Sequence, residues 1–427
     1  MPNLNQHAPL RFITAGSVDD GKSTLIGRLL YDSKALLGDQ LRQIEAAEAD
    51  GNPDFSALTD GLEAEREQGI TIDVAYRYFS TARRKYIIAD TPGHEQYTRN
   101  MVTGASTAHA AVLLLDASQL DYRQTPLQLL PQTKRHSAIL RHLRCPHIIV
   151  AINKIDLLDY DEGKYRAITA AYDTLAAQLG LTNVHYIPIS ALHGDNIVHK
   201  SEHTPWYTGD TLLATLEALP AGEGISDAPA AFHFPVQNVL RADGDKQDDF
   251  RGYQGRIEAG SVRVGDRIRV EPAGQKSSVR EIIGVNGSVE SASVGENITL
   301  RLADDIDISR GDTLLAAANP QAGQRELRAT LCWFDQRPLN PARKYLLKHT
   351  TRTVPAKIRR VEHVWDVHTL SNYADRDTLA MNDLGEVSLV LQQPVAATAY
   401  AENPATGAFI LIDDASNQTV AAGMILA

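Results

Sequence analysis

Residues 16–24, with the sequence Gly-Ser-Val-Asp-Asp-Gly-Lys-Ser-Thr, fit the pattern G-x-x-x-x-G-K-[ST] and carry the clearest chemical signal in the chain. They directly follow an apolar run, Arg11–Ala15, and open a helical pattern, which is the setting that a phosphate-binding loop requires. The two glycines let backbone N–H groups turn towards an anion, and the helix N-terminus adds positive potential. In such a loop Lys22 neutralises the terminal phosphates of a nucleotide, and the Ser23 hydroxyl ligates Mg²⁺.

Residues 90–94, Asp-Thr-Pro-Gly-His, stand at the end of a second apolar strand pattern. An aspartate there can hold Mg²⁺ through a water molecule, and Gly93 can offer its backbone N–H to the terminal phosphate. A D-x-x-G pattern by itself usually marks only a turn, but it becomes informative when it follows a phosphate-loop pattern. Upstream, Thr71 in the run Gly69–Asp73 can add a second hydroxyl ligand to Mg²⁺ when the γ-phosphate is present.

Residues 153–156, Asn-Lys-Ile-Asp, follow a third apolar run, Ile148–Ile152. The Asp156 carboxylate can accept hydrogen bonds from N1–H and the exocyclic amine of guanine. Adenine offers neither donor in that arrangement, so such a site rejects ATP by leaving a buried charge unpaired. Lys154 can pack its stem along the plane of the base, and Ser190-Ala191, after a further strand pattern, can supply a backbone N–H to guanine O6.

The first half of the chain must bring together four groups of residues, which are 16–24, 90–94, 153–156 and 190–191. It alternates short apolar runs with longer helical patterns, which predicts βαβ units and a mostly parallel sheet with helices on both faces. Ligands of such sheets bind at the carboxyl ends of the strands, where all four groups stand. The expected strands are Arg11–Ala15, Tyr86–Ala89, Ala110–Leu115, Ile148–Ile152 and His185–Ile189, and the expected helices include Lys22–Leu30, Lys164–Leu179 and Thr211–Leu219.

The composition shifts at Pro220–Pro229, a Gly- and Pro-rich stretch that reads as a linker. After it, short β-like runs alternate with Gly, Asp and Asn turns, which predicts a small antiparallel barrel, and a second β-rich block begins near Arg325. The predicted domains are residues 1–222, 229–320 and 325–427. The expected strands of the first barrel are Gly255–Glu258, Arg267–Val270, Ser278–Val285 and Asn297–Leu302.

Composition narrows the class of protein. The chain has 427 residues, of which 43% are hydrophobic and 22% charged, as in soluble globular proteins. Its 42 Lys and Arg residues against 53 Asp and Glu residues give a net charge of −11, which opposes a broad footprint on nucleic acid. No stretch approaches the roughly 18 apolar residues of a membrane span, and the first residues lack a secretory signal pattern. We therefore expect a cytoplasmic protein that binds neither membrane nor nucleic acid.

Together, Gly69–Ile72 and the run Asp-Thr-Pro-Gly-His-Glu at 90–95 resemble the translational GTPases, the class of elongation factor Tu and elongation factor 1-alpha. The resemblance implies an α/β P-loop GTPase domain followed by two antiparallel β-barrel domains. It also implies that His94, where Ras-like proteins have Gln, orients the attacking water. Val18 and Ile70 resemble the apolar gate that screens this water.

Within that class the phosphate loop departs from the tRNA carriers, because Ser17 and Asp20 replace the two histidines of the G-H-V-D-H-G loop. Further segments resemble the large subunit of heterodimeric bacterial sulfate adenylyltransferase. They are Leu25–Ser33, Leu62–Phe79, Tyr97–Ser106 and Asn403–Ile425. The resemblance implies that GTP hydrolysis drives ATP and sulfate to adenylyl sulfate and pyrophosphate, the first step of sulfate assimilation. Adenylyl transfer would take place on a separate small, ATP-binding subunit, since this sequence has no S-G-G-x-D-S loop, no H-x-G-H pair and no second phosphate-loop pattern.

The expected ligands are thus GTP and Mg²⁺, and the expected partner is the small catalytic subunit. The residues assigned to nucleotide binding are Gly16, Ser17, Val18, Asp19, Asp20, Gly21, Lys22, Ser23, Thr24, Asp90, Thr91, Pro92, Gly93, His94, Asn153, Lys154, Asp156, Ser190 and Ala191. The catalytic set is His94, Lys22 and Thr71, and the metal ligands are Ser23, Thr71 and Asp90. Two alternatives stay open: a translation-type GTPase that delivers an RNA ligand, and a GTP-binding scaffold without turnover.

Overall fold

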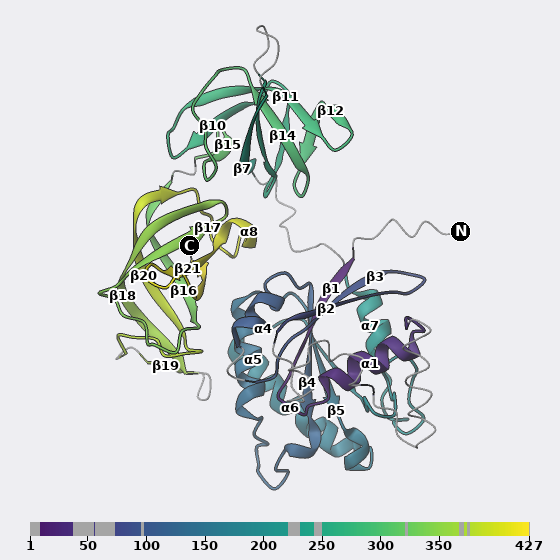
Figure 1. Ribbon diagram of the computed structural model, residues 1–427. Coiled ribbons are helices and arrows are strands. Elements are labelled where there is room, and N and C mark those ends of the chain that lie inside the picture. The colour runs from purple at the N-terminus through teal and green to yellow at the C-terminus, as the bar shows by residue number, and fades with distance from the viewer. Residues whose placement is uncertain are drawn as a thin grey trace. The chain divides into compact units, whose positions relative to one another are not determined.

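The structure is a computed structural model that describes residues 9–36, 55, 73–94, 98–220, 231–242, 250–320, 323–366, 371–373 and 376–426. The chain divides into two compact units (Figure 1). The first holds residues 1–224 with 367–371, and the second holds residues 225–366 with 372–427. Within the described ranges, no helix has the length and apolar character needed to span a bilayer.

A six-stranded sheet with the strand order β2-β3-β1-β4-β5-β6 forms the centre of the first unit. The pairs β3–β1, β1–β4, β4–β5 and β5–β6 are parallel, and only β2 joins antiparallel, at the edge. Every residue of β4 and β5 is buried, as expected for strands that helices cover on both faces. The strands are β1 (Leu10–Ala15), β2 (Ala75–Ser80), β3 (Lys85–Asp90), β4 (Ala110–Asp116), β5 (Ile148–Asn153) and β6 (Val184–Pro188).

Helices α1 and α7 lie on one face of this sheet, and α4, α5 and α6 lie on the other (Figure 1). The apolar side chains of α1 and α7 belong to the same buried cluster as alternate residues of β1, β4 and β5. Local sequence sets the ends of α6, because Asp161 accepts a hydrogen bond from the Lys164 N–H (2.9 Å) and Gly180 closes the helix with a φ of 66°. The helices are α1 (Lys22–Asp32), α4 (Thr98–Ala105), α5 (Pro131–His142), α6 (Glu162–Leu179) and α7 (Leu212–Ala218), with short 3₁₀ turns η3 (Ala117–Gln119) and η4 (Ile155–Leu158).

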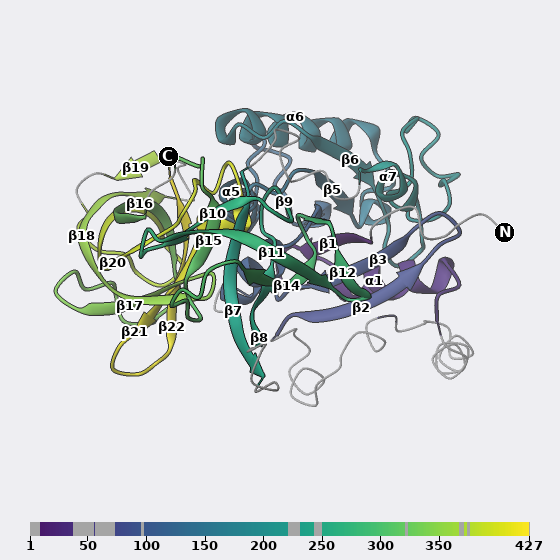
Figure 2. The ribbon, with the colours of Figure 1, turned by 90° about the horizontal axis from the view of Figure 1, so that it is seen from above.

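The second unit contains two closed six-stranded antiparallel barrels. In the first, the ring β10-β15-β7-β8-β14-β11 is closed by pairing of β10 with β11, and β12 is added to β11. In the second, the ring β17-β21-β22-β16-β20-β18 is closed by pairing of β17 with β18. Closure pairs both sides of each ring strand and so removes the exposed sheet edges of an open sheet. Figure 2 views the rings from above.

The strands of the first barrel are β7 (His233–Ala242), β8 (Phe250–Arg256), β10 (Arg267–Glu271), β11 (Lys276–Gly284), β12 (Gly287–Val289), β14 (Asn297–Leu302) and β15 (Thr313–Ala316), beside a separate short pair, β9 (Ser261–Arg263) and β13 (Ser291–Ser293). The second barrel consists of β16 (Gln324–Trp333), β17 (Lys344–His349), β18 (Arg352–Asp366), β19 (Ser371–Tyr373), β20 (Leu384–Val395), β21 (Ala408–Asp413) and β22 (Thr419–Ile425), with the short helix α8 (Pro404–Gly407).

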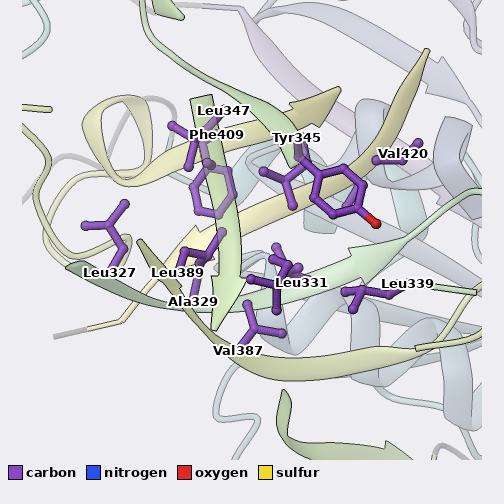
Figure 3. Close-up of a cluster of buried hydrophobic side chains, with 14 of the residues drawn as sticks. Leu327, Ala329, Leu331, Leu339, Tyr345, Leu347, Val387, Leu389, Phe409 and Val420 are labelled. Atoms are coloured by element: carbon purple, nitrogen blue, oxygen red, sulfur yellow. The ribbon is translucent and has the colours of Figure 1, made fainter. Parts of the chain in front are cut away.

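Alternation along the strands builds the core of the second barrel (Figure 3). In β17, Tyr345 and Leu347 point inward and are buried, whereas Lys348 is exposed. The inward side chains of β16, β20 and β21, among them Leu331, Leu389 and Phe409, complete one apolar cluster. The barrel interior is therefore a packed core.

The predicted fold class is confirmed, and each expected strand and helix of the first unit is present within a few residues. One expected barrel strand, Gly255–Glu258, was placed too late, because β8 runs from Phe250 to Arg256. Gly252 and Gly255 interrupt the apolar alternation of that strand, so its sequence pattern does not predict where the strand begins. The boundaries 1–222, 229–320 and 325–427 stay a prediction, since residues 221–230 and 321–322 lie outside the described residues.

Candidate functional site

The four predicted groups lie at one edge of the six-stranded sheet. Because β1, β3, β5 and β6 are parallel, the segments that follow them leave the sheet on the same side. Hydrogen bonds and close approaches then join these segments to one another, as described below. The site is thus one continuous surface made from segments far apart in sequence.

The phosphate-loop residues curve between β1 and α1. The Lys22 Nζ donates to the carbonyls of Gly16 (3.1 Å) and Ser17 (2.6 Å), which folds the side chain back along the loop. Burial lowers the pKa of Lys22, and the nearby carboxylates of Asp90 and Asp20 oppose that shift. The loop therefore holds a buried cation against its own backbone.

The D-x-x-G segment packs directly on this loop. A Cβ on Gly93 would lie 2.4 Å from the Lys22 Nζ and 2.7 Å from the Gly16 carbonyl oxygen, so only glycine permits this approach. The Thr14 hydroxyl donates to the buried Asp90 carboxylate (2.8 Å), and the Thr91 hydroxyl donates to the Thr14 carbonyl (2.6 Å). These bonds fix the Asp90 carboxylate beside the loop.

The Asn153 side chain connects two of the groups. Its Nδ2 donates to the Asp20 carbonyl (2.7 Å), and its Oδ1 accepts from the Ala191 N–H (2.9 Å). Gly21, with a φ of 91°, lies so close that a Cβ there would be 2.5 Å from the Asn153 Nδ2. In this geometry Asn153 links the phosphate loop to the Ser190-Ala191 segment. It also engages the Ala191 N–H that the sequence analysis assigned to guanine O6.

Lys154 forms an ion pair with Asp116 (Nζ to Oδ2, 2.7 Å). Asp116 ends β4, is 2% exposed, and also accepts from the Ser118 N–H (2.9 Å) and hydroxyl (2.6 Å). The sequence analysis missed Asp116, although a lone carboxylate at the end of a fully apolar strand was a usable signal. The pair fixes the ammonium group and so orients the side chain of Lys154.

Asp156 lies in η4 and keeps 15% of its side chain exposed. The His193 Nε2 lies 3.9 Å from the Asp156 carboxylate, a neighbour that the sequence analysis did not anticipate. The segment that carries His193 is shaped by local bonds, because the His193 N–H donates to the Ser190 hydroxyl (3.3 Å) and Arg28 of α1 donates to the Leu192 carbonyl (3.2 Å).

The other predicted site residues lie in the first turn of α1, after Gly93, and near residue 70. Ser23 and Thr24 are half-buried in the first turn of α1, and His94 is exposed. Thr71 and Ile70 lie outside the described residues. In the part of the chain that the structure describes, no group of three or more His, Cys, Asp or Glu side chains has the arrangement of a metal site.

The Asp20 side chain turns under the phosphate loop. Its Oδ2 accepts from the Ser17 N–H (2.5 Å), and a Cβ on Gly16 would lie 2.9 Å from the same oxygen. Burial raises the pKa of Asp20 to about 6, opposed by the Ser17 hydrogen bond and by Lys22. In this geometry the Asp20 carboxylate stabilises the backbone conformation of the loop.

We expect Asp20→Asn to stabilise the nucleotide-free protein at neutral pH. Because the folded-state pKa lies about 2 units above the unfolded value near 3.9, ionisation of Asp20 opposes folding by up to about 3 kcal/mol. This penalty is absent below pH 4, grows between pH 4 and pH 6, and is complete above pH 6. Asparagine retains an oxygen acceptor for Ser17 without the charge.

Denaturant unfolding at a series of pH values should therefore show a stability gain for Asp20→Asn that grows with pH and then levels off. The control is Asp19→Asn, an exposed neighbour, whose unfolding should follow the pH dependence of the wild type. A gain for Asp20→Asn that shrinks as the pH rises would contradict the buried carboxylate.

Comparison with known proteins agrees with this geometry. The family model of the elongation factor Tu GTP binding domain matches residues 8–221, and that of the GTP-eEF1A C-terminal domain-like family matches residues 326–426. The bifunctional enzyme CysN/CysC of Mycobacterium tuberculosis is 49% identical over 423 residues, which cover 98% of this chain and 67% of the relative. Sulfate adenylyltransferase subunit 1 of Saccharophagus degradans is 46% identical over 427 residues, or 98% of this chain and 86% of the relative.

Sulfate adenylyltransferase subunit 1 of Alteromonas mediterranea is 47% identical over 431 residues, which cover 99% of this chain and 88% of the relative. These similarities support the resemblance to sulfate adenylyltransferase and leave the RNA-delivery alternative without support. They extend over both barrels as well as the nucleotide site. The chain therefore belongs to the sulfate adenylyltransferase subunit 1 family and carries a GTP binding domain of the elongation factor Tu type.

Proposed function

We propose that this chain is the GTP-hydrolysing regulatory subunit of a sulfate adenylyltransferase. GTP hydrolysis on it would drive the formation of adenylyl sulfate and pyrophosphate from ATP and sulfate on a separate small, ATP-binding subunit. The observation that carries the proposal is the double hydrogen bond of Asn153, which joins residues 16–24 to the Ser190-Ala191 segment and so supports a nucleotide pocket built from both. The relatives named as subunit 1 support a second subunit in the active assembly.

The phosphate end of the pocket suits a metal-bound triphosphate. The Ser23 hydroxyl and the Asp90 carboxylate are hard oxygen donors of the kind that Mg²⁺ prefers, and Thr14 already holds Asp90 in place. Thr71 is the proposed third ligand. An Mg²⁺ ion held by these residues would help to neutralise the charge that develops during transfer. Lys22, released from its two loop carbonyls, would donate to the terminal phosphates.

Hydrolysis needs a water held in line with the bond that breaks. We assign this task to His94, which follows the tightly packed Gly93 and is exposed at the rim. Val18, 37% exposed, and Ile70 would screen the water as an apolar gate. The water oxygen bonds to the γ-phosphorus, the bond to the β–γ bridging oxygen breaks, and GDP and phosphate leave.

The base end of the pocket selects guanine. The Asp156 carboxylate would accept from N1–H and the exocyclic amine, and Lys154, held by Asp116, would flank the base. Because Asn153 occupies the Ala191 N–H, contact with guanine O6 must share that donor or use the next peptide, Leu192. An adenine base would leave the Asp156 charge without donors.

Asp156→Asn should weaken GTP binding by about 10²-fold or more and admit xanthosine triphosphate, because the amide replaces two accepted hydrogen bonds with one acceptor and one donor. Equilibrium binding of both nucleotides measures the change. Asp159→Asn, an exposed carboxylate at the end of η4, is the matched control and should bind GTP as the wild type does. Unchanged GTP affinity with no gain for xanthosine triphosphate would refute the base-reading role.

His94→Ala should slow single-turnover GTP hydrolysis by about 10²-fold while GTP affinity stays within a factor of a few, because positioning by a side chain contributes on that scale. The control is His185→Ala, an exposed histidine of β6 on the same sheet. If the His94→Ala protein hydrolyses GTP at the wild-type rate, another group orients the water.

The function itself is tested by isolating the native chain from its host, identifying the chain that accompanies it, and following pyrophosphate release from ATP and sulfate. GTP should stimulate that release. The assembly that contains Lys22→Ala should still form but should lose the stimulation by GTP, because the variant lacks the ammonium group that would bind the terminal phosphates. Stimulation that persists in this variant, or an assembly in which GTP has no effect on pyrophosphate release, would overturn the proposal.

A further inference from the structure

The first barrel of the second unit holds a cavity of about 410 Å³ on its own strands. The side chains come from the end of β7, the start of β8, the bulge in β11 and the end of β14. These strands are neighbours in the order β7-β8-β14-β11 (Figure 2). Its lining includes four arginines, two aromatic residues and two aspartates: Arg241, Arg251, Arg280, Arg301, Phe250, Tyr253, Asp304 and Asp305. We call this hollow the arginine cavity.

Strand register brings like charges together at the arginine cavity. Arg241 lies directly opposite Arg251 in the antiparallel pair β7–β8, an arrangement that destabilises a sheet when both side chains carry the same charge. On β11, Arg280 occupies a bulge between Val279 and Glu281, and bulges re-aim a side chain out of the regular ladder. The barrel thus directs four guanidinium groups at one cavity, which an anion would stabilise.

Two of the four arginines are held rigidly. The guanidinium of Arg301 lies over the Phe250 ring (5.0 Å to the ring centre), and that of Arg251 lies over the Tyr253 ring (5.6 Å). Their side chains are only 14% and 20% exposed. Stacking on an aromatic ring fixes the plane of a guanidinium and leaves its N–H groups pointing outward in that plane. The side chain therefore loses little conformational entropy when these groups bind an oxyanion.

Carboxylates already pair with two of these arginines, and Glu281, 31% exposed, forms an ion pair with Arg301 (3.0 Å) that an incoming anion has to displace or share. Asp305 and Asp307 pair with Arg251 (2.5 and 3.5 Å), but they are 87% and 92% exposed, and such pairs contribute little. The Asp304 carboxylate accepts instead from the Ser277 hydroxyl (2.7 Å). A doubly charged oxyanion can therefore exchange with the exposed carboxylates.

We propose that the arginine cavity binds a tetrahedral oxyanion, a sulfate or phosphate group, free or carried by a small molecule. The guanidinium fork matches two oxygens of such a group, and four arginines line this hollow. A hollow of this volume falls in the range of small-molecule sites. The arginine cavity lies on the second unit, whereas the proposed GTP-binding residues lie on the first, and the inference does not depend on the proposed function.

The test uses the full chain saturated with GDP and Mg²⁺, so that the phosphate loop is filled. Calorimetric titrations with inorganic sulfate and inorganic phosphate represent the free ion, and titrations with pyrophosphate and adenosine 5′-monophosphate represent the group on a larger molecule. Chloride holds the ionic strength constant, since sulfate also stabilises proteins non-specifically. We expect saturable binding of at least one of these probes.

Arg241→Gln and Arg280→Gln should each weaken that binding about ten-fold or more, because each substitution removes a charged donor. Both arginines are exposed, so neither substitution disturbs the barrel core. Arg301→Lys keeps the charge, loses the fork, and should also weaken binding. The control is Arg263→Gln, an exposed arginine of β9 outside the lining. Without anion, Arg241→Gln should raise the melting temperature, whereas the control should not.

Three results would overturn the proposal: no saturable binding of any probe to the wild type, equal affinity in all four variants, or binding of an acidic peptide but of none of the small anions. Circular dichroism at the titration temperature confirms that each variant is folded. GTP affinity, which should be unchanged in these variants, separates failure of this site from failure of the nucleotide pocket.

Discussion

The nucleotide site depends on the amide of Asn153, because its two ends hold two loops in a fixed relation. An amide side chain has a donor and an acceptor on one short stem, and both are used here, towards Asp20 and Ala191. Aspartate would lack the donor, and the extra methylene of glutamine would move the amide away from the positions that reach both partners. Since Asn153 is buried, loss of either bond would leave a polar group unpaired, which stabilises the present arrangement against alternatives.

Around this link, charges of opposite sign alternate through the buried part of the site. Lys22 lies among Asp20 and Asp90, and Lys154 is paired with Asp116. Each ammonium group is thus held by carboxylates or carbonyls before a ligand arrives. A triphosphate would add negative charge to a region that already contains two carboxylates, which is an electrostatic reason for the divalent cation of the proposed function.

The sequence predicted the elements whose signal is local. Uninterrupted apolar runs marked β4 and β5, and glycine and lysine spacing marked the phosphate loop. Strand β2 was missed because its tyrosines, Tyr76 and Tyr78, face outward and are 47% and 71% exposed. Helix α5 was missed because it buries polar side chains, His136 and Ser137 among them, which no hydrophobic period reveals.

Within the site, residue types predicted the groups but not their mutual contacts. The Lys154–Asp116 pair and the approach of His193 to Asp156 arise from packing between segments that are distant in sequence. The position of the Asp20 carboxylate depends on the backbone conformation of its own loop. The engagement of the Ala191 N–H by Asn153 likewise could not be inferred from the spacing of the motifs. These contacts change the interpretation of single residues without changing the location of the pocket.

The closure of the two barrels limits how another protein can recognise them. A strand donated by a partner needs an open row of backbone N–H and C=O groups, and in each closed ring those groups already face a neighbouring strand. Among the described strands of the second unit, β-augmentation would be confined to the short additions β12 and β19 and to the β9–β13 pair. A partner subunit that binds elsewhere on the two barrels must recognise the shape and charge of their side chains.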